Sequence, residues 1–227
     1  PAGEAPIALL ERGDLDGTRR RCEEILARAP EDLEAMEALG LVELRQGRPA
    51  SALERIREVA RRRPGNRVAL GNLCAVLVSL RRYDEAMQFA DEILVLDPGN
   101  AEACTTRGIV LQMRKDPEAA LDCYRRALAR QPMHGDAANN AGILLGELGR
   151  HEEALRMFDI ALAARPGFAE VLNNRAVELA ALGREEEALR DYRAAIAARA
   201  GYVDAQKNLA ELLSRMARYE EAIVEHD

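Results

Sequence analysis

The stretch NNRAVELAALGREEEAL, residues 173–189, has a close counterpart 34 residues earlier in NNAGILLGELGRHEEAL, residues 139–155. Self-similarity at a fixed interval of this size is typical of repeat architectures. Prolines recur at the same interval, with Ala200 where the next would stand: Pro30, Pro64, Pro98, Pro132 and Pro166. Alanines keep the register as well: Ala52, Ala86, Ala120, Ala154, Ala188 and Ala222. The chain is therefore predicted to be an uninterrupted array of 34-residue repeats.

Repeat boundaries follow when Leu33 is taken as position 1. Complete repeats then cover residues 33–66, 67–100, 101–134, 135–168 and 169–202. Residues 1–32 are predicted to be a partial N-terminal repeat and residues 203–227 a truncated last repeat, and together they form one continuous solenoid domain. The chain starts at Pro1 without a methionine, so its natural start is expected to be missing.

Each repeat is predicted to fold as two helices. The first helix, as in LEAMEALGLVELRQ, residues 33–46, has its core face at positions 4, 7, 8 and 11, although position 11 is Glu43 in this repeat. A break follows, marked by Gly47, Gly149 or Gly183, and a second helix covers positions 17–30, as in PEAALDCYRRALAR, residues 117–130. Positions 8 and 20 are always Gly, Ala or Cys, which allows the two helices to approach closely. The predicted fold class is an all-α solenoid of antiparallel helix pairs.

The spacing, the alanine, the small residue and the proline resemble the tetratricopeptide repeat, from Leu33 onward and more loosely from Pro1. The resemblance implies a right-handed superhelix in which the first helices line a concave face. Two departures are visible: position 4 is never tryptophan, and position 7, which is usually apolar, is Arg107 and Arg175 in two repeats. Some family members grip a terminal carboxylate with Lys at position 5 and Asn at position 9. Only Lys207 fits that clamp, so acidic chaperone tails are not expected as ligands.

Composition limits the classes of partner. The net charge is -7 and the arginines are interleaved with glutamates, so no nucleic-acid partner is expected. No apolar run approaches the roughly 20 residues that cross a bilayer, so no membrane insertion is expected. The four cysteines lack metal-ligand spacing and are predicted to be small buried residues of a reducing, cytoplasmic compartment. We expect no metal and no cofactor.

Asparagine inside the first helix is the unusual feature of this chain. Its short amide competes for backbone hydrogen bonds and makes it a poor helix-interior residue. Position 6 nevertheless holds Asn72, Asn140, Asn174 and Asn208, and position 5 adds Asn139 and Asn173. Position 6 lies opposite the core stripe and so faces the groove. An amide both donates and accepts hydrogen bonds, which suits the backbone of an extended peptide. We call the position-6 asparagines the asparagine ladder, which Thr106 interrupts.

Two further positions share the groove face. Position 2 is acidic in five of the six repeats counted from Leu33 and includes Glu102, Asp136, Glu170 and Asp204. Position 9 is apolar in five of six and includes Ile109, Ile143 and Val177. These residues predict a basic or apolar extended segment as the ligand. Three alternatives stay open: asparagines copied by duplication, acids that favour the helix dipole, and apolar residues covered by neighbouring repeats.

Three functions are compatible with these patterns. The first is a non-catalytic scaffold that binds a protein or peptide along the groove. The second is the substrate-recognition part of a larger enzyme, because the ladder resembles that of O-linked N-acetylglucosamine transferases, whose amides hold the peptide main chain. The third is self-assembly through the uncapped last repeat, at Ala222 and Ile223. No catalytic residues are expected, since His134, His151 and His226 lie near helix boundaries without a nucleophile.

Overall fold

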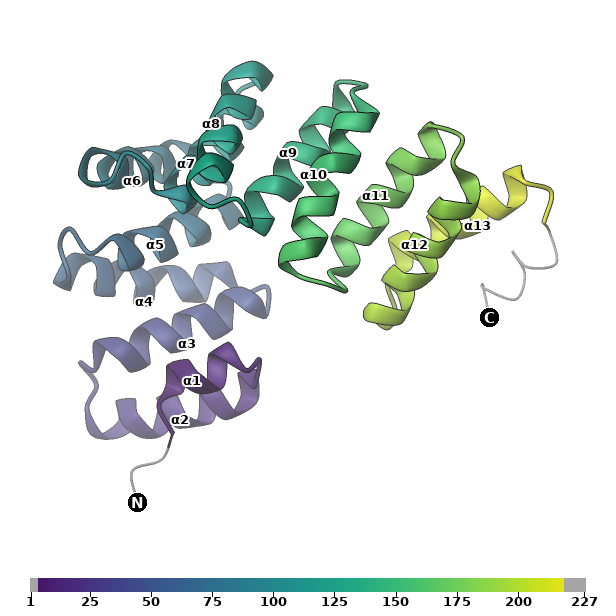
Figure 1. Cartoon of the computed structure of the whole chain (residues 1–227). Coiled ribbons are helices and arrows are strands. Elements are labelled where there is room, and N and C mark those ends of the chain that lie inside the picture. The colour runs from purple at the N-terminus through teal and green to yellow at the C-terminus, as the bar shows by residue number, and fades with distance from the viewer. Residues whose placement is uncertain (1–3, 219–227) are drawn as a thin grey trace. The chain divides into compact units, whose positions relative to one another are not determined.

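The computed structural model describes residues 4–218 and divides the chain into two compact units, Pro1–Arg114 and Lys115–Asp227 (Figure 1). The division falls between two helices of the predicted repeat 101–134. The repeat boundaries and the single continuous domain inferred from the sequence stay predictions. Each unit is described separately below as unit 1 and unit 2.

The described residues form thirteen helices and no strand, which confirms the all-α class and the solenoid of helix pairs. Unit 1 contains α1 (Pro6–Glu11), α2 (Leu15–Arg28), α3 (Leu33–Arg45), α4 (Pro49–Arg62), α5 (Arg67–Ser79), α6 (Tyr83–Leu96) and α7 (Ala101–Met113). Unit 2 contains α8 (Pro117–Arg130), α9 (Gly135–Glu147), α10 (His151–Ala164), α11 (Ala169–Ala181), α12 (Glu185–Ala198) and α13 (Val203–Arg215). The predicted helices 33–46 and 117–130 match α3 and α8 to within one residue.

The last residue of several repeats caps the first helix of the next. Asp32, Asn66 and Asn100 each accept the backbone N–H of the residue three positions later, which satisfies a donor that the helix leaves unpaired. His134 does the same with its Nδ1, which accepts from the Ala137 backbone N–H at 3.1 Å. His134, which the sequence places near a helix boundary, is thus the N-terminal capping residue of α9.

A left-handed residue ends each first helix from α3 onward. Gly47, Gly149 and Gly183 have φ near 71–73°, as their sequence positions predict. The same place is held by Arg81, Lys115 and Ala217, with φ of 56°, 64° and 59°. At Arg81 two backbone bonds close the turn, Arg82 N to Leu77 O and Arg81 N to Val78 O. These bonds retain the turn where glycine is absent.

Small residues at positions 8 and 20 pack the two helices of a pair against each other. A methyl group on Gly142 of α9 would lie 2.6 Å from Phe158 Cε1 of α10, and one on Gly40 of α3 would lie 2.8 Å from Ile56 Cδ1 of α4. The position-20 alanines are fully buried: Ala52, Ala86, Ala120, Ala154 and Ala188. Close helix approach at these positions was predicted from the sequence and is confirmed.

Enlarging a position-20 alanine is expected to destabilise its helix pair. We expect Ala154→Leu to lower the free energy of unfolding by about 1–3 kcal/mol, because the extra carbons must displace packed neighbours. Chemical denaturation followed by circular dichroism measures the loss. Ala163→Leu, on the exposed side of the same helix, is the matched control and should change stability by less than about 0.5 kcal/mol. Equal midpoints for the two variants would contradict this packing.

Arginine at position 7 links successive helices by ion pairs. Arg107 Nη1 lies 2.9 Å from Asp91 Oδ1, and Arg175 Nη1 lies 2.7 Å from Asp159 Oδ1, in each case 16 residues earlier. Arg175 also grips Asp191 of α12 with two nitrogens, at 2.7 and 2.9 Å. These hydrogen bonds raise the pKa of the Arg175 guanidinium. The departure from the usual apolar residue is thus compensated by charge pairing.

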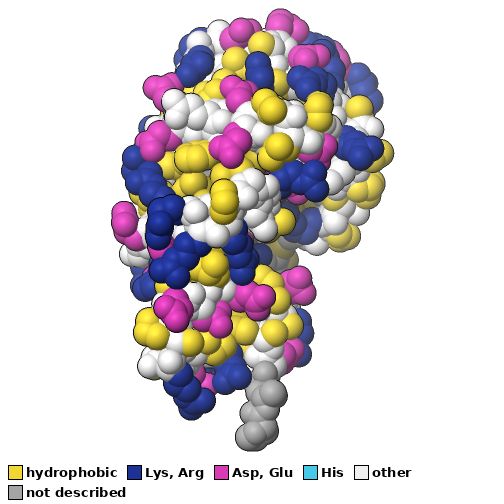
Figure 2. Space-filling model, turned by 90° about the vertical axis from the view of Figure 1, so that its left-hand side faces the viewer, with side chains coloured by type: hydrophobic (Ala, Val, Ile, Leu, Met, Phe, Trp, Pro, Cys, Tyr) yellow, Lys and Arg dark blue, Asp and Glu magenta, His cyan; other side chains and the backbone are white. Residues whose placement is uncertain are grey.

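All four cysteines are free and buried, as predicted, and burial raises the pKa of Cys22 to about 11 and of Cys74 to about 12. Along residues 4–218 no helix has the length and hydrophobicity that would let it cross a membrane. Figure 2 shows acidic and basic side chains interspersed over the face toward the viewer. The apolar residues Ala222 and Ile223, on which the self-assembly hypothesis depends, lie outside the described residues, as does His226.

Candidate functional site

The first helices of successive repeats are neighbours within each unit and form one wall in each unit. In unit 1 this wall consists of α1, α3, α5 and α7, and in unit 2 of α9, α11 and α13. Every predicted groove residue belongs to one of these helices. The wall therefore brings equivalent positions of neighbouring repeats side by side.

A hydrogen-bonded line of polar side chains joins the repeats along this wall. Asn72 Nδ2 donates to Glu37 Oε1 at 2.8 Å, from position 6 of one repeat to position 5 of the repeat before it. In unit 2, Asn208 Nδ2 donates to Asn173 Oδ1 at 3.0 Å, and Asn174 Nδ2 donates to Asn139 Oδ1 at 3.4 Å. All three bonds span 35 residues and follow the same rule.

The asparagines of this line differ in exposure. Asn72, Asn139, Asn140, Asn174 and Asn208 are half-buried. Asn173 is only 7% exposed, so its role is to hold Asn208 rather than to reach a ligand directly. Asn140 forms no equivalent bond within unit 2, because the residue at position 5 of the preceding repeat belongs to unit 1.

Unit 1 contains a hollow of about 360 Å³ against this line. Its walls come from the start of α1, from α3, from α5 and from the turn after α4. The principal lining residues are Ile7, Glu37, Leu41, Arg63, Val68 and Asn72. Arg63 Nη1 pairs with Glu37 Oε2 at 3.1 Å, so both oxygens of Glu37 are occupied, one by Arg63 and one by Asn72.

Unit 2 contains a second hollow, of about 540 Å³, at the equivalent place. It lies between α9, α11 and the start of α13. The principal lining residues are Asn139, Ile143, Glu170, Asn174, Arg199 and Asp204. Four of the predicted groove residues besides Asn139 are thereby brought together: Ile143, Glu170, Asn174 and Asp204.

The acidic residues at position 2 are partly neutralised within the chain. Asp136 pairs with Arg165 at 3.4 Å and Glu170 with Arg199 at 2.9 Å, both across one repeat. The two arginines also lie over aromatic rings, Arg165 4.3 Å from the centre of Phe168 and Arg199 4.9 Å from that of Tyr202. Glu102 is exposed and forms no ion pair with another described residue. The acidic residues at position 2 therefore form separate sites rather than one continuous negatively charged surface.

The apolar residues at position 9 are unequally covered. Ile109 and Ile143 are half-buried, and Val177 is 42% exposed. Only Ile143 of these three lines one of the hollows, and Leu41 is its counterpart in unit 1. The predicted row of aliphatic residues at position 9 is thus partly covered, and only Leu41 and Ile143 line the hollows.

Several groove residues were not predicted. Glu37, Arg63, Arg199 and Tyr202 line the hollows, and the two arginines stand at position 31 of their repeats. Position 31 is arginine in three of the five complete repeats, a recurrence that the sequence carried. Arg63, which directly follows α4, pairs with Glu37 of α3. Arg61 and Arg62 both pair with Glu58, whose pKa falls to about 2 because of these hydrogen bonds.

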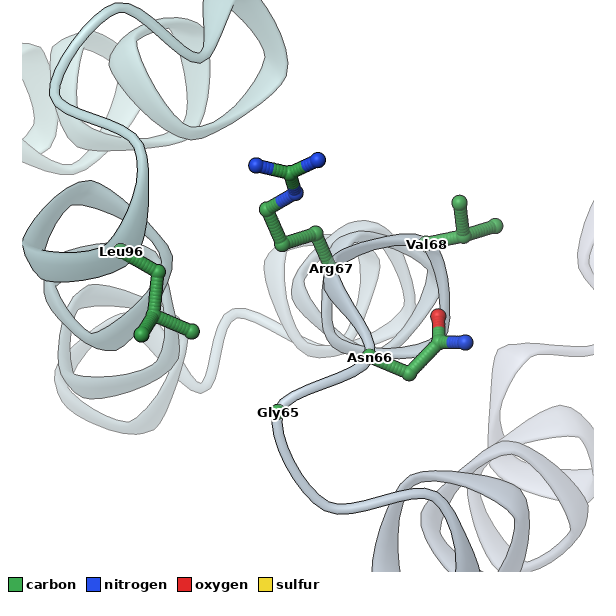
Figure 3. A pocket seen from close by; sticks show the side chains of 5 residues that line it. All are labelled: Gly65, Asn66, Arg67, Val68 and Leu96. Carbon is green, nitrogen blue, oxygen red and sulfur yellow. The ribbon is translucent and has the colours of Figure 1, made fainter.

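A third hollow in unit 1 is lined by residues 65–68 and Leu96, and its polar side chains do not point toward one another. Figure 3 shows Asn66 and Val68 directed away from Leu96. Asn66 caps α5 and Arg67 pairs with Asp97, so neither is free for a ligand there. We do not treat this hollow as a site.

His151 at the start of α10 contacts Glu178 of α11, with 2.6 Å between His151 Nδ1 and Glu178 Oε2. This contact links two repeats, and the structure brings no serine or cysteine hydroxyl or thiol into it. Among residues 4–218, no cluster of three His, Cys, Asp or Glu side chains is arranged to hold a metal ion.

Comparisons with known proteins agree with this architecture. The family model described as "Tetratricopeptide repeat" matches residues 7–67, 38–101, 106–167 and 139–203. No curated protein matches the chain in sequence.

Solved structures share the fold at low sequence identity. A thermophilic TPR protein from Thermus thermophilus matches with a TM-score of 0.70 and 19% identity, covering 80% of this chain and 98% of that one. The APC/C hetero-tetramer Cut9-Hcn1 matches with a TM-score of 0.78 and 16% identity, covering 92% and 41%. MamA matches with a TM-score of 0.54 and 22% identity, covering 70% and 94%. At these identities the likeness concerns the fold alone.

Proposed function

The chain belongs to the tetratricopeptide repeat family, and on that premise we propose that it is a non-catalytic scaffold that holds an extended segment of a partner protein along its first helices. The observation that carries the proposal is the line of amides along the wall, in which Asn72, Asn174 and Asn208 each donate one N–H to the preceding repeat. Helices of this kind are generally binding surfaces because stacked repeats present equivalent side chains in series.

The hydrogen bonds between repeats use Nδ2 of each of these asparagines and leave Oδ1 as an acceptor. One N–H of the amide is used within the chain, so the Oδ1 atom and the second N–H remain for a ligand. Oδ1 can accept a backbone N–H of a peptide without regard to its sequence. The bond to the neighbouring repeat also restricts the rotation of the amide, which reduces the entropy that binding would cost.

Spacing favours an extended ligand. Neighbouring helices pack about 8–10 Å apart, and an extended chain advances about 3.3 Å per residue. One asparagine per repeat would therefore meet about every third residue of the ligand. A helical ligand advances about 1.5 Å per residue and would need a much longer segment to reach the same number of position-6 asparagines.

Replacing position-6 asparagines with alanine tests the proposal. Peptides that bind the whole chain would be selected from a displayed random library and titrated against the parent and against Asn72→Ala and Asn174→Ala. Each substitution should weaken peptide binding about fivefold, because it removes about one hydrogen bond. Helicity should hold or rise slightly, since alanine is the better helix former. Gln88→Ala, which removes an exposed amide from the second helix α6, is the matched control and should leave affinity unchanged.

Two outcomes would contradict the scaffold proposal. One is a library that yields no peptide bound to the first-helix wall. The other is a set of binders whose affinity is the same for the parent, the rung variants and Gln88→Ala.

A further inference from the structure

The hollow of unit 1 and the hollow of unit 2 share several kinds of side chain, although their paired carboxylates come from different positions in the repeat. Each contains an amide at position 6, an aliphatic side chain at position 9, a carboxylate that is already paired with arginine, and a second carboxylate at position 2. In unit 1 the members are Asn72, Leu41, Glu37 with Arg63, and Glu34. In unit 2 they are Asn174, Ile143, Glu170 with Arg199, and Asp204.

The paired carboxylates are less available to a ligand than the unpaired ones, and Glu37 is less available than Glu170. Glu37 accepts from Asn72 and from Arg63, and its side chain is only 13% exposed. Glu170 is held by Arg199, which also lies over the Tyr202 ring. Displacing Arg63 from Glu37 would leave both without a partner at a partly desolvated place, whereas Glu170 and Arg199 are each about half exposed and form a weaker surface pair.

The second carboxylate is different in both hollows. Glu34 and Asp204 are exposed and form no ion pair with another residue in the described part of the chain. Each hollow holds two carboxylates and one guanidinium, so each keeps one uncompensated negative charge.

Aliphatic surface borders each of these free carboxylates. In unit 1, Ile7 is 48% and Val68 68% exposed, and both line the hollow with Leu41. In unit 2, Val203 is 53% exposed and lines the hollow with Ile143. Such apolar area next to one negative charge matches a side chain that has a hydrocarbon stem and a cationic end.

We propose that each hollow receives one lysine or arginine side chain of the extended partner segment, with the stem against the aliphatic wall and the cation at Glu34 in unit 1 or at Asp204 in unit 2. The inference rests on the proposed scaffold function and specifies its partner as a basic segment. Asp136 and Glu170 contribute little to this preference, because arginine already neutralises them. The partner is thus selected at two defined places and not along the whole wall.

Methyl-resolved NMR on the whole chain tests the inference. The probe is a capped peptide of alternating lysine and serine, compared with the same peptide carrying norleucine in place of lysine. We expect the lysine peptide to shift the methyl signals of Ile7 and Leu41 in unit 1 and of Ile143 in unit 2, and to bind more weakly as salt is raised. The norleucine peptide keeps the stem and lacks the cation, so its affinity should be lower.

Three isosteric variants separate the hollows from general charge. Glu34→Gln should weaken lysine-peptide binding at Ile7 about two- to fivefold and leave Ile143 unaffected, the range expected for one partly exposed ion pair. Asp204→Asn should do the reverse. Glu102→Gln makes the same charge change at the same repeat position outside both linings, and should leave both hollows unchanged.

The outcomes distinguish this inference from the scaffold function. Equal binding of the lysine and norleucine peptides, or equal losses in Glu34→Gln and Glu102→Gln, would overturn the cation preference while peptide binding along the wall stands. Methyl signals that respond to neither peptide would overturn the hollows as binding places. The rung variants Asn72→Ala and Asn174→Ala would then decide separately whether the wall binds library peptides.

Discussion

Replacing Phe158 with alanine is expected to lower the free energy of unfolding by about 3–5 kcal/mol. Phe158 is fully buried in α10, and its ring fills the space beside Gly142 of α9. Alanine would leave a cavity against a glycine, which has no side chain to move into it. Urea denaturation followed by circular dichroism measures the loss, and hydrogen exchange should place it in α9, α10 and their neighbours, because repeats contact only adjacent repeats.

Glycine-to-alanine changes supply the control for this packing. Gly142→Ala would place its new carbon within 2.9 Å of three ring atoms of Phe158 and should destabilise unit 2. Gly71→Ala, inside α5, meets no atom within 4 Å and should stabilise its helix by about 0.5–1 kcal/mol. Changes of the same sign in these two variants would show that helix propensity, and not the Phe158 contact, governs position 142.

The Arg175→Leu variant is expected to cost about 3 kcal/mol, the lower end of the range for removing one partner of a buried pair. Arg175 is a quarter exposed, but Asp191 is only 8% exposed and would lose both of its hydrogen bonds to the guanidinium. Leucine at position 7 is of the apolar type that is usual for the family, so packing alone would predict a gain. The free energy of unfolding of the variant decides which effect is larger.

Two further variants test whether the effect of Arg175→Leu comes from the unpaired Asp191. The double variant Arg175→Leu with Asp191→Leu should recover more than half of the loss, because no buried charge is then left unpaired. Arg107→Leu, at the same position two repeats earlier, should cost less than about 1 kcal/mol, since its partner Asp91 is half exposed and makes a single contact. A larger loss at Arg107 than at Arg175 would contradict the role assigned to the buried Asp191.

Helix positions were predictable from the sequence because the signals that set them are local. The 3.6-residue apolar pattern, the capping residue at position 34 and the proline near the end of the repeat all act within one helix or its turn. This is why α3 and α8 match their predicted spans to within one residue. The left-handed turns at Arg81, Lys115 and Ala217 were not predictable, because no glycine marks these positions in the sequence.

The binding groove itself stays a prediction, and the structure shows which of its predicted residues lie near one another. Positions 2, 6 and 9 were placed on one face from helical geometry alone, and the hollows bring together Asn174, Ile143, Glu170 and Asp204. The hydrogen bonds from Asn72 to Glu37 and from Asn208 to Asn173 join residues 35 apart. They depend on the offset at which one repeat stacks on the next, which no single-helix pattern contains. The same offset buries Asn173 and pairs Glu170 with Arg199.

The amino-acid sequence by itself determined the repeat length, the helices, the small residues that bring them together and the family to which the chain belongs. Each of these follows from interactions within a single helix pair, so it is written in one stretch of 34 residues. Only the tertiary structure decided the division into two compact units, the carboxylates that remain unpaired and the asparagines that stay partly accessible. Those features arise where the side chains of one repeat meet those of the next, and their charges and hydrogen bonds are assigned by that contact.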